Sequence, residues 1–269
     1  MNPIPTRSDP AREAFSRQAP VFDALDEENE LITWVRERVR QRVMALYAPG
    51  ERLLEINAGT GIDAFFFAEK GLHVTATDQA PGMLEAMRHK KALRPDLDIS
   101  IADVPFAQLG MFAGHDFDHV FSDFGGLNCI PDLSGVMHNI DALLRPGGTC
   151  SLVIMPRNSL WEWIELFRGN FQLALRRRYK GGATANIEGV PFTCHYHDPQ
   201  AVQRHLPGYV RLELMALSAL VPPPHLLPFA RRHPGLVRTL ERWEERSCRW
   251  PLLRRWGDHY LLVLRRPHR

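Results

Sequence analysis

The chain alternates between short apolar runs and segments whose apolar residues recur at helical spacing. The short runs resemble buried strands, whereas the longer segments between them have the periodicity of helices. Strands that alternate with helices at this spacing predict βαβ units and a parallel sheet covered by helices on both faces. The expected strands are 51–57, 73–78, 98–103, 117–124 and 149–156, and the expected helices between them are 62–71, 81–93 and 131–144, with a turn at 145–148.

The segments on either side of this core have a different character. An amphipathic helix is expected over 28–47, and the aromatic-rich stretch 158–179 also has a helical pattern. After a glycine pair comes a β-like segment, 191–197, so the region after the fifth strand reads as an insertion. A short helix over 198–206 is expected next, capped by Asp198 with Pro199 in its first turn, followed by strands over 209–220 and 258–266.

These patterns divide the chain into four parts. The predicted parts are an N-terminal helical segment that covers the site (1–50), a ligand-binding core (51–156), the insertion (157–200) and the C-terminal part of the sheet domain (201–269). A chain of 269 residues with 45% hydrophobic content is long enough to bury one large core without disulfide bonds or a structural metal.

Cysteine usage and hydropathy indicate the compartment. The four cysteines form no C-x-x-C pair, so neither a zinc site nor a disulfide framework is indicated. No run resembles a signal peptide or reaches the roughly 18 apolar residues of a membrane span. We therefore expect a soluble, cytoplasmic protein that does not span a membrane.

Charge is spread unevenly although the net charge is only +2. Residues 1–30 hold three arginines against seven acidic residues, whereas residues 230–269 hold eleven arginines against four acidic residues. A basic C-terminal face suits an anionic substrate, a membrane surface or a nucleic acid. A solvated helix face is the simpler interpretation.

The turn after the first strand carries the strongest chemical signal. A strand, a glycine-rich turn and a helix together present backbone N–H groups to a ligand. The dinucleotide pattern G-x-G-x-x-G fails here, because Asn57 and Ile62 stand where two of its glycines belong. A phosphate-binding P-loop fails as well, because Gly61 is followed by Ile62 and Asp63 rather than by Lys and Ser or Thr.

The remaining pattern, E-x-N-A-G-T-G-x-D, resembles the first motif of the class I S-adenosylmethionine-dependent methyltransferases, commonly E-x-G-x-G-T-G. Glu55 matches the acid that ends the strand, and Gly59 and Gly61 are retained. Asn57 departs from the motif, but Asn tolerates positive φ better than other non-glycine residues, so we expect the turn to keep its shape. The resemblance implies a Rossmann-like α/β fold with a seven-stranded, mostly parallel sheet and an antiparallel last strand.

Further residues fall at the places that this resemblance implies for S-adenosylmethionine. Asp78 ends the second strand, where the family has its ribose-binding acid, and Asp103 ends the third, where an acid often holds the adenine amino group. Met83 matches a position near the adenine, although core packing explains it equally well. The full set of expected cofactor-binding residues is Glu55, Asn57, Gly59, Gly61, Asp78, Gln79, Met83, Asp103, Val104, Ser122 and Phe124.

Catalytic groups are harder to assign, because a sulfonium already makes the methyl group electrophilic and the protein mainly aligns the reactants. If the acceptor needs a base, His195 and His197 are the weak candidates, since they share one face of a β-like segment. No metal site is expected. The aromatic side chains of the N-terminal segment and the insertion suit an apolar or aromatic small-molecule acceptor.

Two other functions stay open at this stage. One is an RNA-directed methyltransferase that uses Arg176, Arg177, Arg178 and Lys180 with the basic C-terminal region, although nucleic acid is not the expected partner. The [DNS]-P-P-[YF] tetrad of amino-directed DNA methyltransferases is absent from the end of the fourth strand. The other is a non-catalytic partner subunit with a methyltransferase fold, for which Asn57 is the hint.

Overall fold

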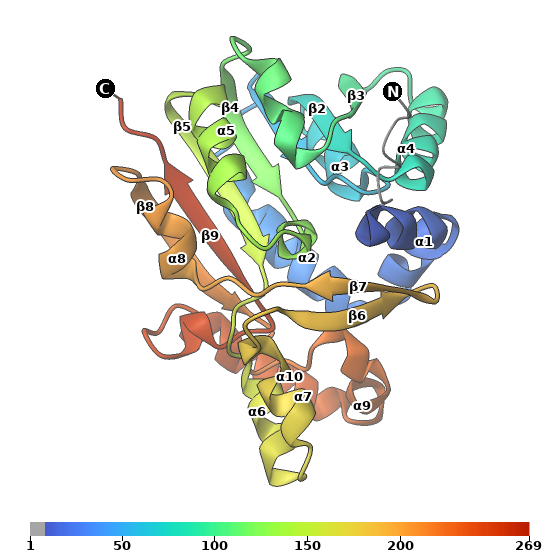
Figure 1. Cartoon of the computed structure of the whole chain (residues 1–269), viewed down its shortest axis with the longest axis vertical. Coiled ribbons are helices and arrows are strands. Elements are labelled where there is room, and N and C mark those ends of the chain that lie inside the picture. The colour runs from blue at the N-terminus through green and yellow to red at the C-terminus, as the bar shows by residue number, and fades with distance from the viewer. Residues whose placement is uncertain (1–8, 269) are drawn as a thin grey trace, which may run out of the picture.

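A seven-stranded sheet forms the centre of the computed structural model, which describes residues 9–268. The strand order is β3-β2-β1-β4-β5-β9-β8, and β9 runs antiparallel to both of its neighbours (Figure 1). This arrangement confirms the predicted Rossmann-like class with an antiparallel last strand. The strands are β1 (Arg52–Ile56), β2 (His73–Asp78), β3 (Ile99–Asp103), β4 (Phe117–Ser122), β5 (Leu144–Ile154), β8 (Val210–Leu217) and β9 (His259–Arg265).

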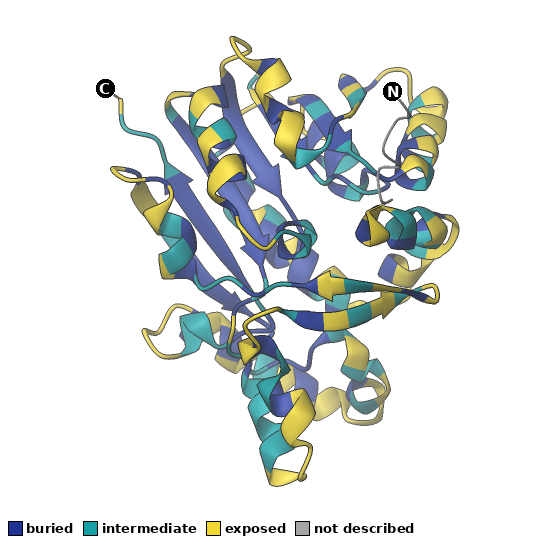
Figure 2. Ribbon diagram, in the orientation of Figure 1, coloured by how far each residue is buried: buried dark blue, intermediate teal, exposed yellow. Residues whose placement is uncertain are grey.

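Helices cover both faces of the sheet, as a buried parallel sheet requires. Successive residues of β1 point to opposite faces, so Leu53 packs in one core cluster and Leu54 in the other. The helices that fill these two faces are α2 (Glu30–Met44), α3 (Ile62–Glu69) and α4 (Pro81–Leu93) on the first, and α5 (Ser134–Leu143) and α8 (Pro199–Arg204) on the second. Figure 2 shows the strands between them as buried.

The change of face between α3 and α5 marks the point where the strand order reverses. From β1 the chain adds β2 and β3 on one side, and it then returns to place β4 on the other side of β1. Ligands of open α/β sheets bind beyond the carboxyl ends of the strands at such a reversal. The topology therefore predicts a ligand site at the carboxyl ends of β1, β2 and β4.

The remaining elements lie below and beside the sheet in Figure 1. Helix α1 (Pro10–Glu27) lies between α4 and the β6–β7 hairpin, and it contacts both. The other elements are α6 (Leu160–Phe167), α7 (Phe171–Leu175), β6 (Ala183–Ile187), β7 (Val190–Cys194), α9 (Leu227–Arg232) and α10 (Pro234–Ser247). No helix within residues 9–268 combines the length and the apolar character that crossing a membrane requires.

The predicted turn at 145–148 differs from the structure, because it lies inside β5. Phe117 of β4 pairs with Leu144, and His119 pairs with Thr149, so the intervening residues form an irregularity in the ladder. Gly147 adopts a φ of 80°, and a Cβ on Gly148 would lie 2.8 Å from the Asp118 carbonyl oxygen. The strand therefore continues through glycines that no larger residue replaces easily.

Two predictions in the region after β5 also need correction. The expected helical stretch 158–179 is broken at Gly169, whose φ of 78° ends the helical course between α6 and α7. Asp198 stands at the N-cap of α8, but its side chain makes no capping bond. Its main-chain carbonyl instead accepts the amide hydrogens of Ala201 and Val202. Strand β6, the partner of the predicted β-like segment, has no counterpart among the predicted elements.

Candidate functional site

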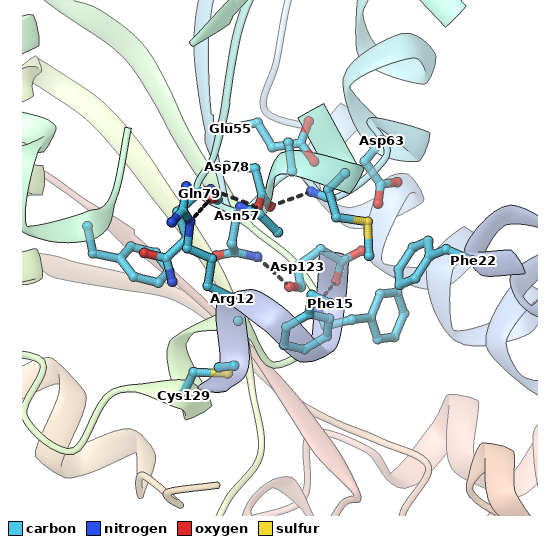
Figure 3. Close-up of a pocket in the computed structure, with 18 of the residues that line it drawn as sticks. Arg12, Phe15, Phe22, Glu55, Asn57, Asp63, Asp78, Gln79, Asp123 and Cys129 are labelled. Atoms are coloured by element: carbon cyan, nitrogen blue, oxygen red, sulfur yellow. Dashed lines mark hydrogen bonds between the residues drawn. The ribbon is translucent and has the colours of Figure 1, made fainter. Parts of the chain in front are cut away.

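A pocket opens at the carboxyl ends of β1, β2 and β4, where the strand order reverses (Figure 3). Its walls come from the turn after β1, the ends of β2 and β4, the segment after β3, and helix α1. In Figure 3, Glu55 and Asp78 lie on one side, while Phe15 and Phe22 of α1 lie on the other. Segments that are distant in sequence thus form one cavity.

Asn57 shapes the turn after β1 through both its backbone and its side chain. Its φ is 54°, followed by positive φ at Gly59 (58°) and Gly61 (86°), so the expected left-handed turn is present. The Asn57 side-chain amide donates to the Asp123 carbonyl (2.9 Å), and its oxygen accepts the Ser122 hydroxyl (2.6 Å). A Cβ on Gly126 would lie 2.4 Å from this amide group, so Gly126 leaves space for it. Asn57 therefore links the β1 turn to the end of β4, a contact that glycine cannot make.

Asp78 is held at the end of β2 by backbone donors. Its Oδ2 accepts the Gly59 amide hydrogen (2.9 Å), and its Oδ1 accepts those of Gln79 and Ala80 (both 2.8 Å). Burial raises the pKa of Asp78, although these three backbone donors oppose that change. The carboxyl group lines the pocket in a fixed orientation and has further acceptor capacity toward the cavity.

A buried cluster of charges lies beneath the pocket. Arg36 of α2 binds Asp26 at the end of α1 (2.6 Å), Asp63 in α3 and Asp123 after β4 (3.2 Å). Arg40 adds a second bond to Asp63, at 2.7 Å. Burial alone would lower the pKa of Arg36, but the three carboxylates raise it above its ordinary value, so the guanidinium remains charged. One side chain thereby connects four segments around the pocket.

Glu55 lies beside this cluster but forms no ion pair with Arg36 or Arg40. It is 2% exposed and lines the pocket, and its Oε2 has no hydrogen-bond partner among residues 9–268. Burial raises the pKa of Glu55 well above its ordinary value, and the neighbouring charges of Asp63 and Asp123 raise it further. The pKa of Asp123 is raised in the same way, first by burial and then by Asp63. Glu55 therefore holds its proton more tightly than an ordinary glutamate does, and it has an unused polar atom at the cavity.

Helix α1 is fastened to the pocket rim by side-chain contacts. Arg12 donates to the Gln79 carbonyl (2.7 Å), and Ser16 accepts the Gly82 amide hydrogen (2.9 Å). Asp23 accepts the Thr60 hydroxyl (2.5 Å) and pairs with Lys90 (2.8 Å). Because these partners belong to the β1 turn, the segment after β2 and α4, the helix covers the residues that approach the ligand.

Most of the residues expected to bind the cofactor converge on this cavity. Eight of them line it, namely Glu55, Asn57, Gly59, Asp78, Gln79, Met83, Val104 and Phe124. Three do not: Ser122 bonds to Asn57, Asp103 lies exposed beside Asp78 in the sheet register, and a Cβ on Gly61 would lie 2.8 Å from Met87. The structure adds lining residues that sequence reasoning missed, among them Arg12, Arg36, Asp63, Asp123 and Cys129.

The two candidate histidines are placed outside the pocket lining. The His197 ring nitrogen Nε2 donates to the Ile130 carbonyl (2.9 Å), and the His195 ring lies beside Gly182. Burial lowers the pKa of both imidazoles. A catalytic role for either one remains an untested prediction. Within residues 9–268, no group of three His, Cys, Asp or Glu side chains is placed to hold a metal ion.

Comparison with known proteins assigns this architecture. The model of a family described as a methyltransferase domain matches residues 53–148, which run from β1 to the glycines of β5. Residues 53–148 are thus similar to a methyltransferase domain, and the segments on either side lie outside the match. This match confirms the resemblance that the glycine turn and the residues after it indicate.

Two curated relatives are named for different methyl acceptors. The malonyl-[acyl-carrier protein] O-methyltransferase of Serratia marcescens is 32% identical over 55% of this chain and 54% of its own length. The demethylmenaquinone methyltransferase of Renibacterium salmoninarum is 31% identical over 53% of this chain and 57% of its own length. The chain thus spans little more than half the length of these relatives.

A solved structure agrees over more of the chain. The 1,6-didemethyltoxoflavin N1-methyltransferase of Burkholderia thailandensis, whose structure holds its substrate and S-adenosylhomocysteine, superposes with a TM-score of 0.56 at 17% identity. The alignment covers 96% of this chain and 88% of that one. At this identity the likeness concerns the fold.

The first prediction concerns Asn57→Gly. Glycine relieves the positive φ but removes two hydrogen bonds and leaves the fully buried Ser122 hydroxyl without its acceptor. We expect a net loss of about 1–2 kcal/mol in the free energy of unfolding, measured in urea. Glu188→Gly is the matched control, because Glu188 has a φ of 49° in an exposed turn. Equal or greater stability of Asn57→Gly would show that the side-chain bridge contributes nothing.

The second prediction concerns Arg36→Met. Removing the guanidinium leaves Asp26, Asp63 and Asp123 buried without their shared counterion, which should lower the free energy of unfolding by about 3–5 kcal/mol. Arg17→Met is the control, because Arg17 pairs with Glu13 on the exposed side of α1 and should change stability by less than about 1 kcal/mol. Similar effects of the two substitutions in chemical denaturation would contradict a central role for Arg36.

The third prediction concerns the pH dependence of stability. Because the pKa of Glu55 is raised in the folded protein, the folded state holds this proton where the unfolded state, with a pKa near 4.5, has released it. The contribution of Glu55 to the free energy of unfolding therefore falls as the pH rises above about 4.5. Between about pH 5 and pH 8, the free energy of unfolding of Glu55→Gln should therefore rise relative to that of the unmodified protein.

Urea unfolding at several pH values measures this difference. Glu85→Gln, an exposed carboxylate on α4, serves as the control and should follow the curve of the unmodified protein. A stability difference for Glu55→Gln that does not change with pH would mean that Glu55 is ionised in the folded protein.

Proposed function

We propose that this chain transfers a methyl group from S-adenosylmethionine to a small-molecule acceptor. The observation that carries the proposal is the orientation of Asp78, whose carboxyl group is fixed by three backbone amides beside the glycine turn and lines the pocket. A carboxylate in this position suits the two ribose hydroxyls of a nucleoside. The match of residues 53–148 to a methyltransferase domain supports the same ligand.

The cavity also fits the rest of that cofactor. The unused Oε2 of Glu55 is buried at the pocket, so a ligand donor such as an ammonium group would satisfy it. Gly59 exposes backbone where a side chain would narrow the cavity toward Phe22 and Met83. Glu55, Asn57 and Gly59 would hold the methionine end, and Asp78 with Gln79 the ribose.

The adenine would lie toward the segment after β3. Met83 and Val104 line that side of the pocket and would contact the ring, while Asp103 would hold the exocyclic amino group from the rim. Gly61 and Ser122 would act indirectly, by allowing the turn and by fixing Asn57. Phe124 would border both ligands at the end of β4.

S-Adenosylmethionine supplies an electrophilic methyl group, so the protein needs to align the acceptor and exclude water. The described residues offer means for both. Helix α1 covers the cavity with Phe15 and Phe22, and its contacts to Thr60 and Gln79 hold it over the cofactor residues. Water exclusion by α1 would strengthen the electrostatic interactions beneath it.

The acceptor is proposed to be apolar or aromatic. Phe15, Phe106, Phe124 and Cys129 add apolar lining to the cavity, and burial raises the pKa of the Cys129 thiol to about 12, so it remains neutral. A flat, uncharged ring would fill this space better than a polar chain would. The cytoplasmic location expected from the sequence stays a prediction.

The fourth prediction tests the cofactor proposal by calorimetric titration with S-adenosylmethionine and S-adenosylhomocysteine. The unmodified protein should bind both, and Asp78→Asn should bind about 10- to 100-fold more weakly, the effect of weakening hydrogen bonds to a charged group. Asp96→Asn, which changes an exposed carboxylate paired with Arg94, is the control and should bind as the unmodified protein does.

Each contrary result has a distinct meaning. Equal affinity of Asp78→Asn and the unmodified protein would contradict the assigned orientation of the cofactor. Absence of binding by the folded, unmodified protein would replace the proposal with the non-catalytic partner subunit. Methyl transfer to RNA, with binding that weakens steeply as salt rises, would instead favour the RNA-directed enzyme.

A further inference from the structure

Exposed apolar side chains concentrate at one end of the molecule. Thirteen large apolar side chains are exposed among residues 9–268, and eight of them belong to α6, α7, α10 or the segments that directly follow α7 and α10. Phe167 is 93% exposed and Leu252 is 80% exposed. Exposed apolar side chains that gather in one region are typical of an interaction surface, whereas singly scattered ones are ordinary. The eight are Phe167, Phe171, Leu173, Tyr179, Leu236, Trp243, Trp250 and Leu252.

The α6–α7 hairpin projects from the sheet domain at the bottom of Figure 1. Phe167 ends α6, Phe171 begins α7, and the tip between them is exposed in Figure 2. The acidic side chains of the hairpin are already engaged: Glu162 binds Arg176 and Arg177, and Glu165 binds Arg168. The tip therefore presents two phenyl rings without an unpaired negative charge.

Helix α10 presents a second part of the same surface. Leu236 and Trp243 are seven residues apart, which places both on one side of the helix, and the buried Val237 and Glu244 lie on another. Arg238, Arg242 and Arg246 are exposed and have no ion-pair partner within the described part of the chain. Glu244 points inward and accepts two backbone amide hydrogens.

Aromatic contacts link α6 to α9 and to the segment after α10. Trp161 of α6 lies 6.3 Å from Phe229 of α9, and Trp163 lies 5.6 Å from Trp256, both measured between ring centroids. The Leu160 amide also donates to the Trp256 carbonyl. Figure 1 accordingly shows α6, α7, α9 and α10 together below the sheet. We call this surface, formed by residues 160–179 and 227–256, the basic end.

We propose that the basic end docks on an anionic lipid membrane. Helices that lie in a bilayer interface combine exposed Trp, Phe and Leu side chains with arginines that reach phosphate headgroups. Both groups occur here on projecting elements, and the arginines of residues 227–256 outnumber the acidic residues Glu241, Glu244 and Glu245. A nucleic acid explains the arginines and the stacked rings, but exposed aliphatic side chains such as Leu236 and Leu252 gain little from bases or phosphates.

The docked orientation connects the membrane to the pocket. The chain leaves α7 and forms the β6–β7 hairpin, whose Phe192 ring lies 5.8 Å from that of Phe15 on α1. Phe15 lines the pocket. One continuous insertion therefore runs from the proposed membrane contact to the cover of the cavity. Delivery of an apolar acceptor along this route rests on the proposed function, whereas docking itself does not.

The fifth prediction tests docking by flotation of the full chain with vesicles of phosphatidylglycerol and phosphatidylcholine, compared with vesicles of phosphatidylcholine alone. Binding should require the anionic lipid and weaken as salt rises. The double variant Phe167→Ser/Phe171→Ser should bind about tenfold or more weakly, because two exposed rings no longer leave water. Leu93→Ser/Met111→Ser is the matched control, since both side chains are exposed outside the basic end.

Circular dichroism confirms that each variant is folded, and titration with S-adenosylhomocysteine reports the pocket separately. Loss of flotation with unchanged cofactor affinity supports docking, whatever the outcome for the proposed function. No flotation of the unmodified protein, or equal flotation of both double variants, overturns the proposal. Binding to polyuridylate without flotation assigns the surface to nucleic acid, and a dimer that Phe167→Ser/Phe171→Ser dissociates assigns it to a second copy.

Discussion

The buried guanidinium of Arg36 is the interaction on which the geometry of the pocket depends. It neutralises carboxylates from α1, α3 and the end of β4, three segments that the sheet alone does not hold together. Buried charges are stable only when they are paired, so these segments are positioned by electrostatic necessity as well as by apolar packing. Glu55 lies beside the cluster without an ion pair of its own among residues 9–268, and its burial, together with the charges of Asp63 and Asp123, raises its pKa.

The same cluster connects the cover of the pocket to its floor. Asp26 ends α1, and Asp63 lies in the first turn of α3, directly after the glycine turn. Movement of α1 away from the rim would separate Asp26 from Arg36 as well as Asp23 from Thr60. Ligand access and the charge balance under the cofactor residues are therefore linked. Asn57 contributes a neutral link of the same kind between the β1 turn and β4.

The sequence is informative where local rules decide the outcome. The spacing of apolar residues, together with the turn residues, predicts the five parallel strands. The tolerance of Asn for positive φ predicts the turn at Asn57. Family resemblance brings Asp78 and Val104 to the cavity. Contacts distant along the chain are not predictable in this way. Arg36 looks like any polar position of an amphipathic helix, and Arg12 carries no motif, because their roles arise only when α1 and α2 pack on the sheet domain.

The central claim is that the pocket closed by α1 holds S-adenosylmethionine. Amide hydrogen exchange of the full chain, with and without S-adenosylhomocysteine, tests this claim directly because it reports the turn and the helix separately. The account predicts slower exchange upon ligand binding at Ala58–Gly61, at Gln79–Ala80 and along α1. Unchanged exchange in all three segments at saturating ligand would contradict it.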